Sequence, residues 1–170
     1  GDDGAIWGGE VFYNTKRVEH LEYVKMPAGD KIAKNADLAL ACYDGSNELI
    51  NKAIEGNINI INSSSMGRLF DAVCASLDIK HRNCYEGECA AALEAFAKRA
   101  KKAYYIEPTL NPRKIINAVK NAKAPKEEVA LGFHYMLSQL ILDISKKYDI
   151  DKVTLSGGCF VNRILLSKTQ

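Results

Sequence analysis

The chain has 170 residues, of which 47% are hydrophobic and 26% are charged, and its net charge is +2. This composition is typical of a globular protein with a core and excludes a disordered chain. The near balance of charge argues against nucleic-acid or membrane-surface binding, and no apolar run approaches the ~18 residues of a membrane span. We therefore expect no nucleic acid and no membrane among its partners.

The five cysteines are irregularly spaced and form no Cys-x-x-Cys pair. Such a pattern predicts reduced thiols and a cytoplasmic location, because disulfides persist mainly in oxidising compartments. Cys84 and Cys89, next to His81, offer the residue types of a zinc site, but packing of Cys89 on a helix is the favoured interpretation. We predict no metal site contained within this chain.

The N-terminal part predicts a β-hairpin, with strands at 6–13 and 18–26 joined by a connection at 14–17. Gly8 and Gly9 interrupt the first strand and predict a bulge or a close approach of another backbone. Trp7 and Glu10 flank these glycines, and core packing is the favoured role for Trp7.

Periodic apolar positions, caps and prolines predict the helices of the chain. They are expected at 31–43 with Asp30 as its N-cap, 48–55, 66–77, 85–102, 113–121 and 125–148. Residues 57–62 are expected in a loop and 104–106 in a short strand. His134 lies beside the apolar stripe of the longest helix, where a structural role is favoured over a catalytic one.

A serine run precedes the helix at 66–77 and makes its start a candidate anion or ribose site. Hydroxyl groups, free N–H groups and the carboxylate of Asp71 converge there, near Gly67 and Arg68. The alternative is a helix cap alone, which serine already explains and which this stretch taken by itself favours.

The stretch 151–162 predicts a buried strand at 153–155, a turn at Ser156–Gly158 and a helix from about Phe160. Glycines at the turn allow close backbone approach to a phosphate, and the helix start directs N–H groups toward it. Asn162 would add a side-chain amide. The alternative is that any strand-to-helix turn favours glycine. Cys159 is interpreted as a small packing residue and not as a nucleophile.

Four stretches together resemble, in order, a known family. They are DDGAIWGGE at 2–10, SSMGRLFDAV at 64–73, YEGE at 85–88, and LSGG at 155–158 with Asn162 and Arg163. This series resembles the C-terminal carbamoyltransferase region of the HypF family of hydrogenase-maturation proteins, which is similar to the universal tRNA threonylcarbamoyl transferases. The resemblance spans almost the whole chain.

The resemblance implies a helix-rich α/β fold that is part of the actin-like, sugar-kinase-like (ASKHA) two-lobed ATPase fold. Residues 1–62 would belong to the first lobe and 63–170 to the second, the chain being a fragment of a larger multidomain protein. A nucleotide would lie between two walls, one formed by Gly67 and Asp71 and the other by Gly157, Gly158 and Asn162. By resemblance, the nucleotide-binding residues are Ser64, Gly67, Arg68, Asp71, Gly157, Gly158 and Asn162.

The resemblance also implies a reaction, in which carbamoyl phosphate and ATP with Mg²⁺ form carbamoyl adenylate. The carbamoyl group then passes to the C-terminal cysteine of a HypE-like partner, for the cyanide ligand of a [NiFe]-hydrogenase. The partner's thiolate is the nucleophile, so no catalytic residue is assigned in this chain.

The family's iron or zinc ligands match no position here, so the chain alone is expected to be inactive. Two alternatives stay open: an O-carbamoyltransferase acting on a small-molecule hydroxyl, and a non-catalytic module that docks the partner.

Overall fold

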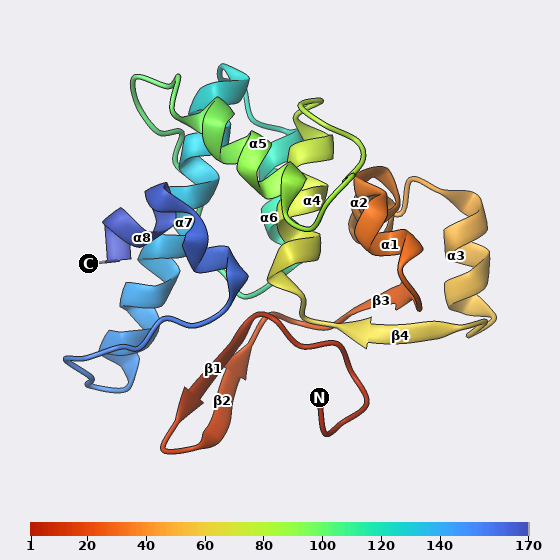
Figure 1. Ribbon diagram of the computed structural model, residues 1–170, viewed down its shortest axis with the longest axis horizontal. Helices are drawn as coiled ribbons and strands as arrows, with labels where there is room; N and C mark the ends of the chain where they lie inside the picture. The colour runs from red at the N-terminus through yellow and green to blue at the C-terminus, as the bar shows by residue number, and fades with distance from the viewer. Residues whose placement is uncertain (170) are drawn as a thin grey trace.

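The computed structural model describes residues 1–169 and consists of a helical body with two small antiparallel sheets along one side (Figure 1). The strands are β1 (Glu10–Tyr13), β2 (Lys16–His20), β3 (Val24–Pro27) and β4 (Ile60–Ser63). The helices are α1 (Lys31–Lys34), α2 (Ala36–Asp44), α3 (Glu48–Glu55), α4 (Met66–Ser76), α5 (Glu88–Ala97), α6 (Pro112–Lys120), α7 (Lys126–Lys147), the 3₁₀ helix η1 (Gly158–Val161) and α8 (Arg163–Thr169).

The predicted hairpin is confirmed as β1 and β2, which pair antiparallel through a tight turn. Asn14 and Thr15 both have positive φ, 47° and 66°, as the favoured two-residue hairpin turn requires. The turn is thus shorter than predicted, and the bulge lies between Val11 and Phe12 instead of at the glycines.

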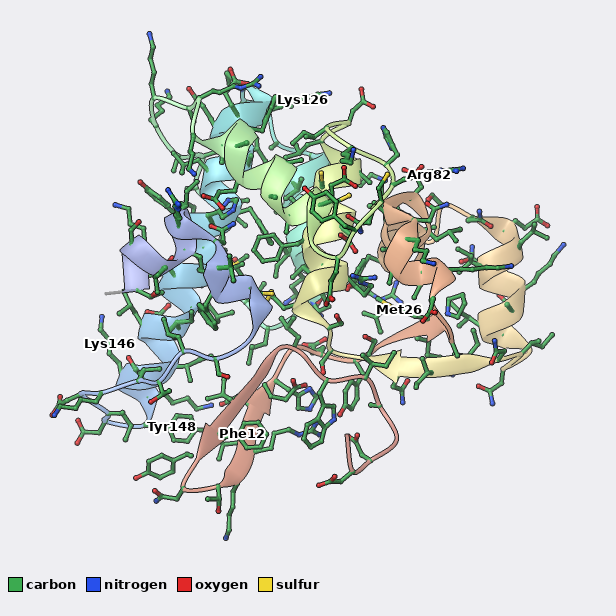
Figure 2. All side chains as sticks on the ribbon, in the orientation of Figure 1. Phe12, Met26, Arg82, Lys126, Lys146 and Tyr148 are labelled. Carbon is green, nitrogen blue, oxygen red and sulfur yellow. The ribbon has the colours of Figure 1, made fainter. Side chains whose placement is uncertain are left out.

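The hairpin rests against the C-terminal end of α7. Lys147 and Tyr148 bond the Glu19 carboxylate, and the Tyr13 and Tyr148 rings lie 5.7 Å apart. Figure 2 shows Tyr148 next to the part of the hairpin that carries Phe12.

The predicted second strand is divided in two, because its backbone changes partner along its length. Leu21 donates its N–H to Gly9 O at 2.9 Å and Glu22 donates to Leu110 O at 2.8 Å, outside any ladder. β3 then pairs antiparallel with β4, whose existence corrects the loop predicted for 57–62. Ile6 adds a parallel bridge to Ser63, so the N-terminal segment extends this sheet.

The helix predicted at 31–43 is also divided, at Asn35, whose backbone is extended. The loop after α4 pairs with this point: Ala36 N donates to His81 O and Asn83 N donates to Lys34 O, both at 3.0 Å. Asn35 caps α2 through its side chain, whereas the predicted cap, Asp30, makes no capping bond.

The core lies among α2, α4, α5, α6 and α7, which gather in one body (Figure 1). Leu69, Val73 and Phe133 are fully buried, and the Phe70 and Phe133 rings meet edge to face with centroids 5.0 Å apart. Burying each such side chain contributes about 1.5–3 kcal/mol. The predicted apolar stripes of α4 and α7 are therefore confirmed.

Three other predictions of local structure were wrong. α5 ends at Ala97 instead of 102, and neither 104–106 nor 153–155 forms a strand among the described residues. A strand needs a backbone partner, and no backbone hydrogen bond joins 153–155 to the rest of residues 1–169. Val153 is 51% exposed, contrary to the buried strand expected there. Within residues 1–169, no helix has both the length and the apolarity needed to cross a membrane.

Candidate functional site

Serine side chains cap the start of α4, as the capping interpretation predicts. Ser65 Oγ accepts a bond from Arg68 N at 3.4 Å, and Ser63 Oγ accepts one from Ser65 N at 3.2 Å. Met66 and Gly67 open the helix, and their N–H groups have no partner among the described residues. Capping and anion binding are therefore compatible here, because two donors stay free.

Ser64 is only 2% exposed. Its hydroxyl bonds the carboxylate of Glu10, and its N–H donates to Ile6 O at 2.9 Å. The side chain of this predicted nucleotide contact thus holds the N-terminal segment of the chain.

Arg68 and Asp71 are brought together as a largely buried ion pair, with Arg68 Nη2 2.9 Å from Asp71 Oδ2. Burial raises the pKa of Asp71, although the hydrogen bond from Asn83 and the charge of Arg68 act in the opposite direction. Arg68 Nη1 and Asp71 Oδ2 are buried without a hydrogen bond in the part of the chain that the structure describes. One guanidinium donor is therefore left without a partner inside the fold of residues 1–169.

Asn83 links Asp71 to the rest of the helical body, a role that the sequence analysis missed. Its Nδ2 donates to Asp71 Oδ1 and to Ala33 O, both at 2.9 Å, and its Oδ1 accepts from Cys89 N at 2.7 Å. No local pattern marks this residue, because its partners come from three separate segments.

The Ser156–Gly158 turn has one position that demands glycine. Gly157 adopts φ 101° and ψ 162°, a region that essentially only glycine occupies. Gly158 has no such constraint, and a Cβ added there would meet nothing within 4 Å. The turn leads into η1, and α8 begins at Arg163, which corrects the helix start predicted at Phe160.

Asn162 lies inside the fold, where it is 7% exposed. Its Oδ1 accepts from Leu165 N at 3.0 Å as the cap of α8, and its Nδ2 lies 2.9 Å from His134 Nε2. His134 Nδ1 must carry the ring proton, because its partner at 2.8 Å, Ala130 O, can only accept. Burial lowers the pKa of His134, and both of its ring nitrogens have partners inside the fold, which agrees with the structural interpretation.

Cys159 follows the glycine turn and packs, partly buried, against the core. Burial raises the pKa of its thiol, with the charge of Asp71 acting in the same direction and that of Arg68 in the opposite one. A neutral, partly buried thiol agrees with the packing interpretation, because reactivity requires a thiolate.

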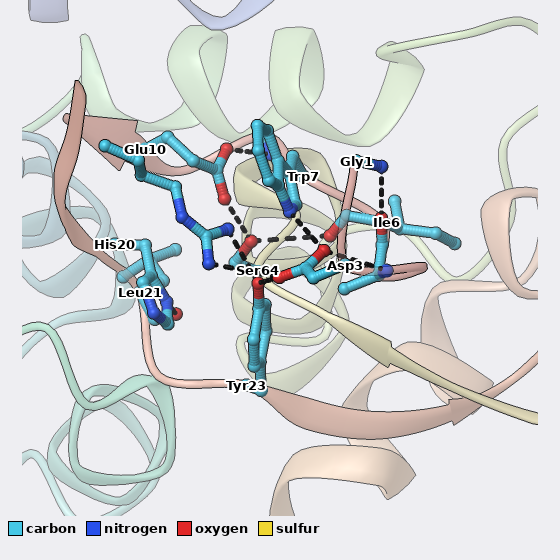
Figure 3. Close-up of polar contacts among 12 residues, drawn as sticks. Gly1, Asp3, Ile6, Trp7, Glu10, His20, Leu21, Tyr23 and Ser64 are labelled. Atoms are coloured by element: carbon cyan, nitrogen blue, oxygen red, sulfur yellow. Dashed lines mark hydrogen bonds and ion pairs between the residues drawn. The ribbon is translucent and has the colours of Figure 1, made fainter. Parts of the chain in front are cut away.

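A polar cluster formed by the N-terminal segment was also missed (Figure 3). The carboxylate of Asp3 accepts bonds from Tyr23, from Trp7 Nε1 at 2.9 Å and from Arg17 Nη2 at 3.0 Å. The bond from Tyr23 is the main cause that lowers the pKa of Asp3. Arg17 also lies over the Trp7 ring, 4.3 Å from its centroid, so Trp7 belongs to this surface cluster and the predicted core role was wrong.

Two cavities lie elsewhere and contain none of the predicted site residues. One, of about 450 Å³, lies between the 103–108 loop and α7, and the other, of about 400 Å³, between the end of α2 and α6. No group of three or more potential metal ligands is found within residues 1–169.

A family model described as "Carbamoyltransferase, Kae1-like Domain, second subdomain" matches residues 1–170. The chain belongs to this HypF carbamoyltransferase family. HypF of Synechocystis is 29% identical over 99% of this chain, which covers 28% of that protein. A HypF homolog of Cupriavidus necator is 27% identical over the whole chain, which covers 54% of it.

Two solved HypF structures show the same fold. Full-length HypF in a phosphate- and nucleotide-bound form superposes with a TM-score of 0.84 at 28% identity, over 99% of this chain and 32% of that one. HypF of T. kodakarensis superposes with a TM-score of 0.83 at 25% identity, over 98% of this chain and 28% of that one. The chain thus spans between about a quarter and about a half of the length of the relatives and structures named above.

Proposed function

We propose that this chain is part of a HypF-type carbamoyltransferase in which the start of α4 and the 156–158 turn form the two walls of a site for ATP and carbamoyl adenylate with Mg²⁺. The observation that carries the proposal is the superposition on HypF crystallised with phosphate and nucleotide, over 99% of this chain. The free N–H groups of Met66 and Gly67 support it, because a helix N-terminus suits a phosphate.

The proposed reaction transfers a carbamoyl group to the C-terminal cysteine of a HypE-like partner, for cyanide-ligand synthesis in [NiFe]-hydrogenase maturation. The partner's thiolate attacks the carbonyl carbon of carbamoyl adenylate and forms a C–S bond. The bond from that carbon to the phosphate oxygen breaks, and AMP leaves with the electron pair. The carbonyl oxygen carries negative charge meanwhile, which donors held in place stabilise.

This chain contributes donors and not a nucleophile. The α4 N–H groups would hold the nucleotide phosphate, and the guanidinium of Arg68, in the first turn of the same helix, would add a positive charge. Iron or zinc, if the longer protein carries it, would be bound by residues outside this chain. We further propose that the protein works in the cytoplasm.

The test is a calorimetric titration of this chain with ADP and Mg²⁺, using two variants at one position. Gly67→Glu places a negative charge in the first turn of α4. That charge interacts favourably with the helix dipole but repels a phosphate. We expect affinity to fall at least about ten-fold while stability is kept. Gly67→Ala is the matched control, since the nearest atom to an added Cβ is 3.7 Å away.

Unchanged affinity in Gly67→Glu would exclude the start of α4 as the nucleotide site. The acceptor is tested in the longer protein, with a peptide ending in cysteine against small alcohols. Transfer to an alcohol alone would favour the O-carbamoyltransferase alternative.

A further inference from the structure

Glu10 connects the N-terminal segment to the start of α4, although it lies outside the predicted site. Its Oε1 accepts a bond from Ser64 Oγ and its Oε2 accepts one from Gly8 N at 2.5 Å. Ser64 Oγ also lies 3.3 Å from Ile6 O, but a hydroxyl has a single proton, and the charge-assisted bond to Glu10 is the shorter one. Glu10 therefore sets the orientation of the Ser64 hydroxyl (Figure 3).

The two glycines before Glu10 allow this contact to form. A Cβ on Gly9 would lie 2.8 Å from Ser64 O, and a Cβ on Gly8 would lie 3.2 Å from Ser65 Cα. Only bare backbone fits at the first of these distances, so the segment lies directly against the turn at Ser64 and Ser65. The close approach predicted for Gly8 and Gly9 is thereby confirmed, with the start of α4 as the neighbouring backbone.

The turn that Glu10 holds determines where the free donors of α4 point. Ser65 Oγ caps Arg68 N, and Ser65 O accepts from Leu69 N at 3.2 Å, so Ser65 defines the first turn. Met66 and Gly67 follow directly, with their N–H groups unpartnered in the part of the chain that the structure describes. A shift of the turn would therefore move these donors.

We propose that Glu10 is a positioning residue of the nucleotide site: through Ser64 it fixes the first turn of α4 and aims the Met66 and Gly67 N–H groups at the phosphate. The inference rests on the proposed function and adds a residue that acts without touching the ligand. A carboxylate is suited to this role because it accepts both bonds at once. Glutamine offers one acceptor oxygen and directs its NH₂ group at a donor.

The experiment compares Glu10→Gln with Glu19→Gln by ADP titration and by amide hydrogen exchange. Glu19 is a matched control, because it lies on the same hairpin but bonds Lys147 and Tyr148 at the far end of α7. In Glu10→Gln we expect about ten-fold weaker binding and faster exchange confined to the Arg68 and Leu69 amides. Glu19→Gln should change neither.

A double variant tests the route through the hydroxyl. If Glu10 acts through Ser64, adding Glu10→Gln to Ser64→Ala should weaken binding no further. Unchanged Arg68 and Leu69 exchange in Glu10→Gln, or exchange that rises throughout the chain, would overturn the inference, and this result can be read without nucleotide. If the wild type does not bind ADP but the local exchange responds, the proposed function fails while Glu10 still positions the turn.

Discussion

Asp3 and Asp71 are both aspartates paired with an arginine, yet their surroundings drive their pKa values in opposite directions. Asp3 lies at the surface, where a bond from Tyr23 and others from Trp7 and Arg17 lower its pKa. Asp71 is 1% exposed, and burial raises its pKa despite Asn83 and Arg68. Desolvation of the charged form thus exceeds the pairing in the helical body, whereas pairing dominates in the N-terminal segment.

The difference shows that an aspartate–arginine pair has no fixed effect on stability. The contribution of each pair to stability depends on how much water its charged groups lose on folding. It also depends on whether every donor and acceptor has a hydrogen bond. In the buried pair, Arg68 Nη1 and Asp71 Oδ2 have no hydrogen bond within the described residues. Buried polar atoms without a hydrogen bond destabilise the fold, and such groups are found most often at functional sites. Their presence here agrees with the proposed role of Arg68.

The largest effect is expected from Asp71→Ala. It removes the countercharge of Arg68 and an acceptor of Asn83, and uncompensated buried charges of this kind lower the free energy of unfolding by about 3–5 kcal/mol. Urea denaturation followed by circular dichroism measures the loss. A loss below about 1 kcal/mol would show that water already reaches the pair.

The double variant Arg68→Met/Asp71→Leu sharpens the same comparison. Replacing both charges with apolar groups removes the desolvation penalty, so stability should return to within about 1 kcal/mol of the wild type. ADP binding should nevertheless fall in this variant if Arg68 contacts the nucleotide. Recovered stability together with unchanged affinity would assign the pair a purely structural role.

A smaller, local effect is expected when the pH is lowered. Because the folded-state pKa of Asp3 is depressed, its contribution to stability is present above the unfolded pKa, about 3.9, and is lost as the pH falls through the folded value. Asp71, whose pKa is raised, gives no such loss in acid. Trp7 is the single tryptophan and bonds Asp3, so its fluorescence should change only well below about pH 4, where Asp3 becomes protonated in the folded protein.

The matched variant for this titration is Asp3→Asn, which keeps an acceptor but does not ionise. The fluorescence change caused by protonation of Asp3 should be absent in it. An identical acid transition in both proteins would mean that Trp7 reports another group.

The smallest effect is expected at Lys52, which pairs with Glu48 along α3 at 2.7 Å. Both side chains are largely exposed, so Lys52→Gln should change the free energy of unfolding by less than about 0.5 kcal/mol. In the same urea denaturation experiment, this exposed pair gives the reference effect with which those of the two aspartate–arginine pairs are compared. A change above about 1 kcal/mol would contradict the view that burial decides the strength of such pairs.

Much of the helical framework was predictable from the sequence. The bounds of α3 were predicted as observed, and those of α4, α6 and α7 to within one residue at each end. These elements depend on local features: apolar residues three and four positions apart, a capping side chain, and proline at or before the first turn. The Asn14–Thr15 turn is local in the same sense.

The candidate site was predictable only in part. The serine cap and the glycine at 157 follow from short-range rules, and the structure shows both. The predicted contacts of Ser64, Asp71 and Asn162 with a nucleotide stay predictions, because the structure shows their protein partners and no ligand. Those partners are Glu10, Asn83 and His134, each contributed by another segment.

The sequence by itself determined the family, the helix-rich α/β class and most helices. Only the tertiary structure decided the break at Asn35, the pairing of β3 with β4 and the burial of Asp71. The physical reason is that a helix closes its hydrogen bonds within four residues, whereas a strand, a helix break or a buried charge is defined by groups distant in the chain. The periodicity of a sequence therefore indicates helices, but it carries no information on contacts between distant segments.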